Sequence, residues 1–211
     1  MSDTEDSLDP ADGTAADPNI VRMYRADDAG ALVFREAWVD EGEAGEDGAW
    51  FVVNHGTVGR QSTSDETAVD AVKEAFGMLA AFREQCLADG YAELPREDQF
   101  AVVAQFALKN DRVTDRDRHL EARAREALTA HLAWRGSGIV EKTEFKAGAH
   151  GTGKLNIYVL APDAARAVAN IKVCIREEKL DFTKLSVASA PATDLGALKA
   201  KHGPAGATFS L

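Results

Sequence analysis

The sequence has few of the residues that build disulfide frameworks, metal sites and membrane spans. Its 211 residues include two cysteines, Cys86 and Cys174. Both fall in predicted amphipathic helices, whereas disulfide frameworks and CxxC metal sites need paired cysteines in loops, so we expect two reduced, packed thiols. No window reaches the ~18 uncharged apolar residues of a membrane span, and the amino terminus is acidic instead of basic and then apolar. The sequence therefore predicts a cytoplasmic protein without a signal or transit peptide.

Recognisable catalytic and ligand-binding motifs are also scarce. There is no Gly-x-Ser-x-Gly elbow and no histidine at metal-ligand spacing from another ligand, and His131 falls on the apolar stripe of a predicted helix. Residues 148–154 have the spacing of a phosphate loop, but no Ser or Thr follows Lys154 and the chain is expected to continue as a strand. We interpret this segment as a hairpin loop. The sequence predicts no metal, no cofactor and no catalysis.

The charge is negative and unevenly distributed. There are 35 acidic and 24 basic residues, for a net charge of -11. Residues 1–19 carry six acids and no base, acids also exceed bases in residues 20–95, and bases exceed acids in residues 96–211. Non-specific nucleic-acid binding depends on Lys and Arg displacing counterions from phosphates. The front half would therefore repel a duplex unless its few bases were gathered on one face.

Composition and periodicity divide the chain into a disordered acidic tail at 1–19, a domain at 20–94 and a domain at 96–211. In the first domain we predict antiparallel strands at 20–25, 31–39 and from residue 50, followed by an amphipathic helix that begins at Asp65 as N-cap and ends near residue 89. Gly90 suits a left-handed helix cap, and Tyr91 is expected to fold back on the sheet.

The second domain is predicted to run strand, helix, strand, strand, helix, strand. The strands are expected at 100–108, 139–146, 155–160 and 183–189, and the helices at 115–134 and 162–180. This βαββαβ order is typical of a ferredoxin-like sandwich, in which two helices cover one face of four antiparallel strands. A short helix at 195–201 and an edge strand at 207–211 are expected after it. The predicted fold class is α+β.

The open face of this second sheet is a predicted binding surface. Alternation along the strands places four lysines and one tyrosine on the side away from the helices. These residues are Lys109, Lys142, Lys146, Tyr158 and Lys184. RNA-recognition sheets of this topology stack bases on two or three aromatic side chains, and only Tyr158 is available here. We interpret the face as a solvated surface, with a weak nucleic-acid or acidic-partner surface as the alternative.

A family resemblance rests on the segment His55-Gly56-Thr57-Val58-Gly59, which follows a strand and precedes a long amphipathic helix that ends at Gly90-Tyr91. This pattern resembles a WGR domain, the module of nuclear poly(ADP-ribose) polymerases and of some bacterial regulators. The resemblance covers residues 21–94 and implies a small antiparallel sheet backed by one helix. In the polymerases the namesake Trp and Arg help to grip a DNA end and contact neighbouring domains.

His55 and Thr57 occupy the positions of that Trp and Arg, whereas the glycines and Val58 are kept. The loss of an indole that stacks and a guanidinium that pairs with phosphate weakens the implied DNA binding, while the turn still supports the fold. Arg60 is a candidate replacement for the lost charge. The turn residues predicted to bind a partner are Asn54, His55, Thr57 and Arg60.

Three functional hypotheses follow. The first is a non-catalytic bacterial binding or adaptor protein, in a DNA-associated setting, that contacts DNA or another protein through the turn and the basic sheet face. The second is an acidic inhibitor or immunity-type protein whose front half covers a basic enzyme or toxin by charge complementarity. The third is a ferredoxin-like dimer that senses a small molecule. The identity of the partner and the oligomeric state stay open at this point.

Overall fold

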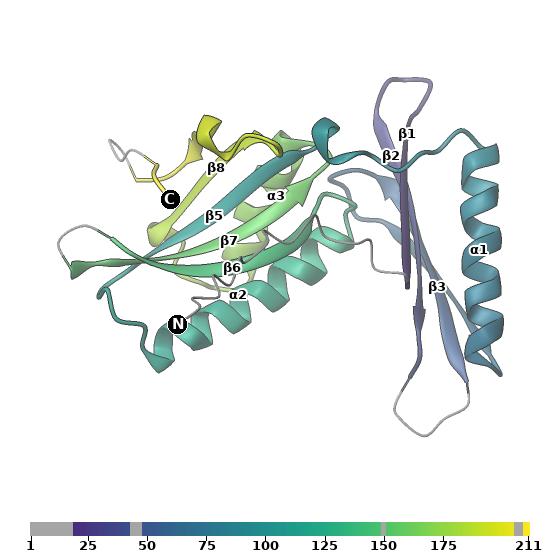
Figure 1. Cartoon of the computed structure of the whole chain (residues 1–211), viewed down its shortest axis with the longest axis horizontal. Helices are drawn as coiled ribbons and strands as arrows, with labels where there is room; N and C mark the ends of the chain where they lie inside the picture. The colour runs from purple at the N-terminus through teal and green to yellow at the C-terminus, as the bar shows by residue number, and fades with distance from the viewer. Residues whose placement is uncertain (1–18, 43–47, 149–150, 205–208) are drawn as a thin grey trace, which may run out of the picture.

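The computed structural model describes residues 19–42, 48–148, 151–204 and 209–211. They form two lobes, each built from one antiparallel sheet with helices against one face (Figure 1). This confirms the predicted α+β class. The predicted tail lies outside the described residues except for Asn19. None of the described helices is both long and apolar enough to span a bilayer.

The first lobe is a four-stranded meander with one helix. Its elements are β1 (Ile20–Ala26), β2 (Leu32–Asp40), β3 (Ala49–Thr57), β4 (Thr63–Val69) and α1 (Val72–Ala88). The helix buries Ala75, Leu79 and Cys86 against the sheet. It ends where Gly90 takes a φ of +81°, and the amide of Tyr91 then donates to the Cys86 carbonyl at 2.9 Å. Tyr91 is buried against the sheet, as predicted.

The predicted helix start at Asp65 is wrong. Residues 63–69 form the edge strand β4, paired with β3, and α1 begins only at Val72. All side chains of β4 before Val69 are polar or small and most are exposed, so the strand lacks the apolar alternation by which strands are recognised. Val69 lies at helical spacing before Val72 and Phe76, which favours a helix, yet it reaches the core from the end of a strand.

The second lobe contains the six predicted elements in the predicted order. They are β5 (Phe100–Leu108), α2 (Asp115–Ala133), β6 (Ile139–Ala147), β7 (Gly153–Ala161), α3 (Ala164–Glu177) and β8 (Leu185–Pro191). With a fifth strand, β9 (Lys199–His202), the sheet order is β6-β7-β5-β8-β9 and every pairing is antiparallel. Both helices pack on the same face through a core that includes Phe106, Leu128, Ile157 and Ile171.

The carboxy-terminal prediction is wrong in its first part. Residues 195–197 form one turn of 3₁₀ helix and 199–202 form β9 instead of a helix. The four residues of β9 present no apolar face, and the strand exists because it pairs with the otherwise free edge of β8. Of the predicted edge strand at 207–211, residues 207–208 lie outside the described residues and 209–211 are not a strand.

Candidate functional site

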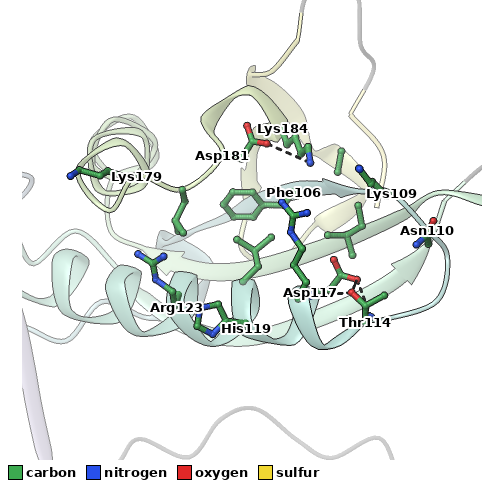
Figure 2. Close-up of a pocket in the computed structure, with 15 residues that line it drawn as sticks. Phe106, Lys109, Asn110, Thr114, Asp117, His119, Arg123, Lys179, Asp181 and Lys184 are labelled. Carbon is green, nitrogen blue, oxygen red and sulfur yellow. Dashed lines mark hydrogen bonds and ion pairs between the residues drawn. The ribbon is translucent and has the colours of Figure 1, made fainter.

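A pocket of about 480 Å³ lies in the second lobe where β5 ends, α2 begins and α3 leads into β8 (Figure 2). Its floor is apolar. Phe106 is fully buried there, Leu108 is 8% exposed, and Leu120 and Leu180 are partly buried against the core. The pocket thus joins three segments that are far apart in the sequence, at 106–110, 114–123 and 179–184.

Local hydrogen bonds fix the backbone around this pocket. α2 opens with a capping box in which the Asp117 amide donates to the Thr114 hydroxyl, while the Thr114 amide donates to the Asp117 carboxylate at 2.9 Å. α3 ends with the Leu180 amide donating to the Ile175 carbonyl at 3.1 Å and with Lys179 at a φ of +54°. Together with the Lys179 amide, which donates to the Arg176 carbonyl at 3.1 Å, this bond resembles the common glycine-ended helix cap, but a lysine stands at the left-handed position.

The wall of the pocket is positively charged. Five cationic side chains and two carboxylates line it: Lys109, Arg116, Arg123, Lys179, Lys184, Asp117 and Asp181. Figure 2 shows Lys109 and Lys184 on one side of the pocket, Arg123 and His119 on the other, and Lys179 pointing away from its centre. The cations therefore surround the apolar floor from α2, from the end of β5 and from the α3–β8 connection.

The two carboxylates are held by their own turns. Asp117 belongs to the capping box. Asp181 accepts hydrogen bonds from the amide and hydroxyl of Thr183, and its carboxylate lies 3.4 Å from the Lys184 ammonium. The hydrogen bonds from Thr183, followed by the contact with Lys184, hold the pKa of Asp181 below its usual value. Arg123 lies 3.7 Å from the Glu178 carboxylate.

Three of the cations make no ion pair. Within the part of the chain that the structure describes, Lys109, Arg116 and Lys179 have no carboxylate within 4.0 Å. Lining cations without counter-charges create a positive potential that attracts anions, to which Lys179 contributes only its charge because its side chain points away from the pocket centre (Figure 2). The site therefore has the charge and shape to hold an anionic ligand.

Lys109 and Lys184 were predicted on the open face of the sheet, and this placement is wrong. Lys109 follows the last residue of β5, and Lys184 belongs to the 3₁₀ turn Phe182–Lys184 that precedes β8. Strand alternation does not apply at either position, and both residues line the pocket. Arg116, Arg123 and Lys179 were missed; the excess of bases after residue 95 is the one sequence signal that points to them.

The other three residues of that prediction do lie together on the open face. The Lys142 ammonium sits 4.7 Å from the centre of the Tyr158 ring, the Tyr158 hydroxyl donates to Glu144 at 2.7 Å, and Lys146 lies 3.6 Å from the same carboxylate. Tyr158 is only 5% exposed. Burial and the adjacent Glu144 carboxylate raise the pKa of Tyr158 to about 12. The ring is committed to internal contacts and is not free to stack a base.

The carboxy-terminal residues cover part of the same face. The side-chain amide of Gln105 donates to the Ser210 carbonyl at 2.9 Å, and the Lys154 ammonium donates to the same oxygen at 2.7 Å. Lys154 is the lysine of the phosphate-loop spacing, and its segment connects antiparallel β6 and β7, which confirms the hairpin interpretation. Residues 149–150 of that loop lie outside the described residues. The sheet face is thus less open than the alternation pattern predicts.

The turn of the WGR-like segment contacts the second lobe. The Gly59 amide donates to the Arg135 carbonyl at 2.8 Å and the Ser62 amide donates to the Trp134 carbonyl at 3.2 Å. The side-chain amide of Asn54 donates to the Ala133 carbonyl at 3.3 Å. These carbonyls belong to the last residue of α2, to its C-cap Trp134 and to the residue after it, where a helix has no internal donors left to bond them.

This contact divides the four predicted turn residues. Asn54 is 2% exposed and serves the junction between the lobes. Thr57 is half-buried, and its carbonyl accepts the amide of Arg60 at 3.0 Å to close the turn. His55 is exposed and lies 3.8 Å from Asp65, and Arg60 is exposed. His55 and Arg60 therefore remain accessible to a partner, whereas Asn54 and the Thr57 carbonyl are used within the chain.

Other candidates for chemistry are buried or scattered. Among the described residues, no group of three or more His, Cys, Asp or Glu side chains is placed to hold a metal ion. Cys86 and Cys174 are free and buried, and burial, followed by the nearby Glu178, raises the pKa of Cys174 to about 12. His131 is packed between α2 and α3, as its place on the apolar stripe indicates, with a side chain that is 9% exposed.

Fold and site together define a two-lobed α+β protein with a basic, apolar-floored pocket in its second lobe. Comparison with protein-family models, with curated proteins and with solved structures gives no match to this chain.

Proposed function

We propose that the chain is a non-catalytic binding protein that takes up an anionic ligand in the basic pocket of its second lobe. The observation that carries this proposal is the group of five cations that line an apolar floor, three of which have no carboxylate within 4.0 Å among the described residues. Because both carboxylates of the pocket are engaged in turn-forming hydrogen bonds, the ligand meets cationic donors and His119. This favours holding an anion over transferring a group.

The proposed architecture is a WGR-like module followed by a ferredoxin-like domain. The four-stranded meander, its single helix and the turn with Gly59 at a φ of +85° support the first assignment. The strand order β6-β7-β5-β8 with two helices on one face supports the second. The contact between the turn and α2 favours a role for the WGR-like module in holding the neighbouring domain over a grip on DNA.

Calorimetric titration of the full chain with inorganic pyrophosphate, at low and at high salt, tests the proposed function. Lys109→Glu with Arg116→Glu reverses two pocket charges, and we expect it to abolish binding. The matched control is Arg112→Glu with Arg118→Glu, which makes the same change in net charge on the same segment with two exposed residues outside the pocket lining. We expect the control to bind like the wild type.

Salt supplies a second criterion. Binding driven by exposed cations weakens as the Debye length shrinks from about 30 Å at 0.01 M salt to about 8 Å at 0.15 M. No heat of binding at low salt, or equal losses in the two double variants, would refute a pocket-centred anion site.

A further inference from the structure

We propose that the ligand is a small organic phosphate, with the phosphate at the cationic wall and an aromatic or apolar remainder on the floor. This inference rests on the proposed function and narrows it to one chemical class. A purely inorganic anion would use only the wall. The floor, with Leu120 and Leu180 partly exposed beside the buried Phe106, would then be left in contact with water.

The size of the pocket supports a compact molecule. Small-molecule sites are typically ~300 to 1,000 Å³ and are lined by apolar side chains with a few charged groups that fix orientation. At about 480 Å³, this pocket falls in that range. It accommodates a molecule of the size of a nucleoside monophosphate and is too small to enclose a folded partner.

The charge supports a phosphate as the head group. The lining cations exceed the lining carboxylates by three, since five stand against two. A phosphate monoester carries up to two negative charges and three acceptor oxygens, and arginine presents a planar fork of donors that matches phosphate geometry. A single carboxylate would leave more of this positive charge uncompensated.

Two of the cations occupy positions that local helix rules disfavour. Arg116 lies in the first turn of α2, where the positive end of the helix dipole repels a cation. Lys179 adopts a left-handed conformation that favours glycine. Departures from local preference are expected at functional sites, where another gain offsets them. Both departures here add positive charge to one pocket.

The test is an amide chemical-shift titration of the full chain, at pH 7 and low salt, with four probes: inorganic phosphate, adenosine, AMP and phenyl phosphate. We expect AMP or phenyl phosphate to bind at least about tenfold more tightly than either inorganic phosphate or adenosine, because only the combined molecule contacts both wall and floor. The shifted amides should lie at the start of α2 and at residues 179–184.

Two variants separate the two halves of the site. Leu120→Gln makes the floor polar, and we expect it to lower the affinity for AMP and phenyl phosphate to that for inorganic phosphate. Arg116→Gln should weaken all phosphate probes. Arg118→Gln, on the same helix and outside the lining, should weaken none.

The outcomes distinguish this inference from the proposed function. If inorganic phosphate or pyrophosphate binds at the pocket but neither organic phosphate binds more tightly, the proposed function stands and the organic phosphate is refuted. If no anion shifts the pocket amides, both fail. Tighter organic phosphate binding that Leu120→Gln does not reduce would also overturn the role of the floor.

Discussion

Gly136 lies at the junction between the two lobes, and its substitution by alanine offers the sharpest test of that junction. The residue follows the end of α2 with a φ of +54°, and Phe34 of the first lobe packs directly over it. A Cβ at this position would come closer than 3.0 Å to three ring atoms of Phe34, a separation that real Cβ atoms essentially never show. Phe34 is 1% exposed, so its ring has little room to move.

The expected cost has two parts. A left-handed backbone costs a residue with a Cβ ~1 kcal/mol more than glycine. Displacing a packed ring costs a further ~1 to 3 kcal/mol. Gly136→Ala should therefore lower the free energy of unfolding by about 3 kcal/mol, a large fraction of the ~5 to 15 kcal/mol that stabilises a typical domain.

Urea denaturation, followed by tryptophan fluorescence, measures this free energy. Gly30→Ala is the matched control, because Gly30 has a φ of +78° and nothing within 4 Å of an added Cβ, so it should cost only about 1 kcal/mol. In a Phe34→Leu background the cost of Gly136→Ala should fall to about 1 kcal/mol, the value expected for Gly30→Ala. Equal costs for Gly136→Ala and Gly30→Ala in the wild-type background would refute the proposed steric conflict.

Three further predictions concern stability. Lys179→Gly should raise the free energy of unfolding by about 1 kcal/mol because it removes the left-handed strain, whereas Lys179→Ala, which keeps a Cβ, should give no gain. Glu36→Ala should cost about 3 to 5 kcal/mol in the same assay, because it leaves the nearly buried Arg22 guanidinium without its partner at 2.5 Å; a cost below about 1 kcal/mol would contradict this. His131→Gln should flatten the loss of stability between pH 7.5 and 5.5, because burial and then Arg135 lower the pKa of His131 in the fold.

The sign of the pH effect follows from that lowered pKa. Above the unfolded-state value of about 6.5 the imidazole is neutral in both states and contributes no pH dependence. Below it the unfolded chain binds the proton more readily than the folded chain, so the wild-type protein loses stability as the pH is lowered. A slope unaffected by His131→Gln would contradict the prediction.

The elements of the second lobe were predictable because each carries a strong local pattern. β5 alternates apolar residues, α2 and α3 repeat them at helical spacing, and the structure places all three at or near the predicted bounds. β4 and β9 were not predictable in this way. Both are edge strands with few apolar side chains, and their conformation is set by the strand beside them, which local sequence does not reveal.

The pocket shows the same limit. Lys109 and Lys184 were recognised as candidate binding residues, but they were assigned to the wrong surface because each lies just outside the strand whose alternation was used. Arg116 and Arg123 look like ordinary exposed helix residues in the sequence. Only the packing of α2 against α3 and the sheet brings them beside the other cations, so the site has no sequence motif with a fixed spacing.

Donors from the first lobe bond the carbonyls at the end of α2, so neither lobe is a self-contained unit. A chain cut between the lobes, near residue 95, would leave the carbonyls of Ala133, Trp134 and Arg135 to water and uncover Phe34. Each lobe would then expose the surface that the other lobe covers in the whole chain. Any rearrangement that gave the second lobe a new neighbour would have to supply three replacement donors at the same helix end.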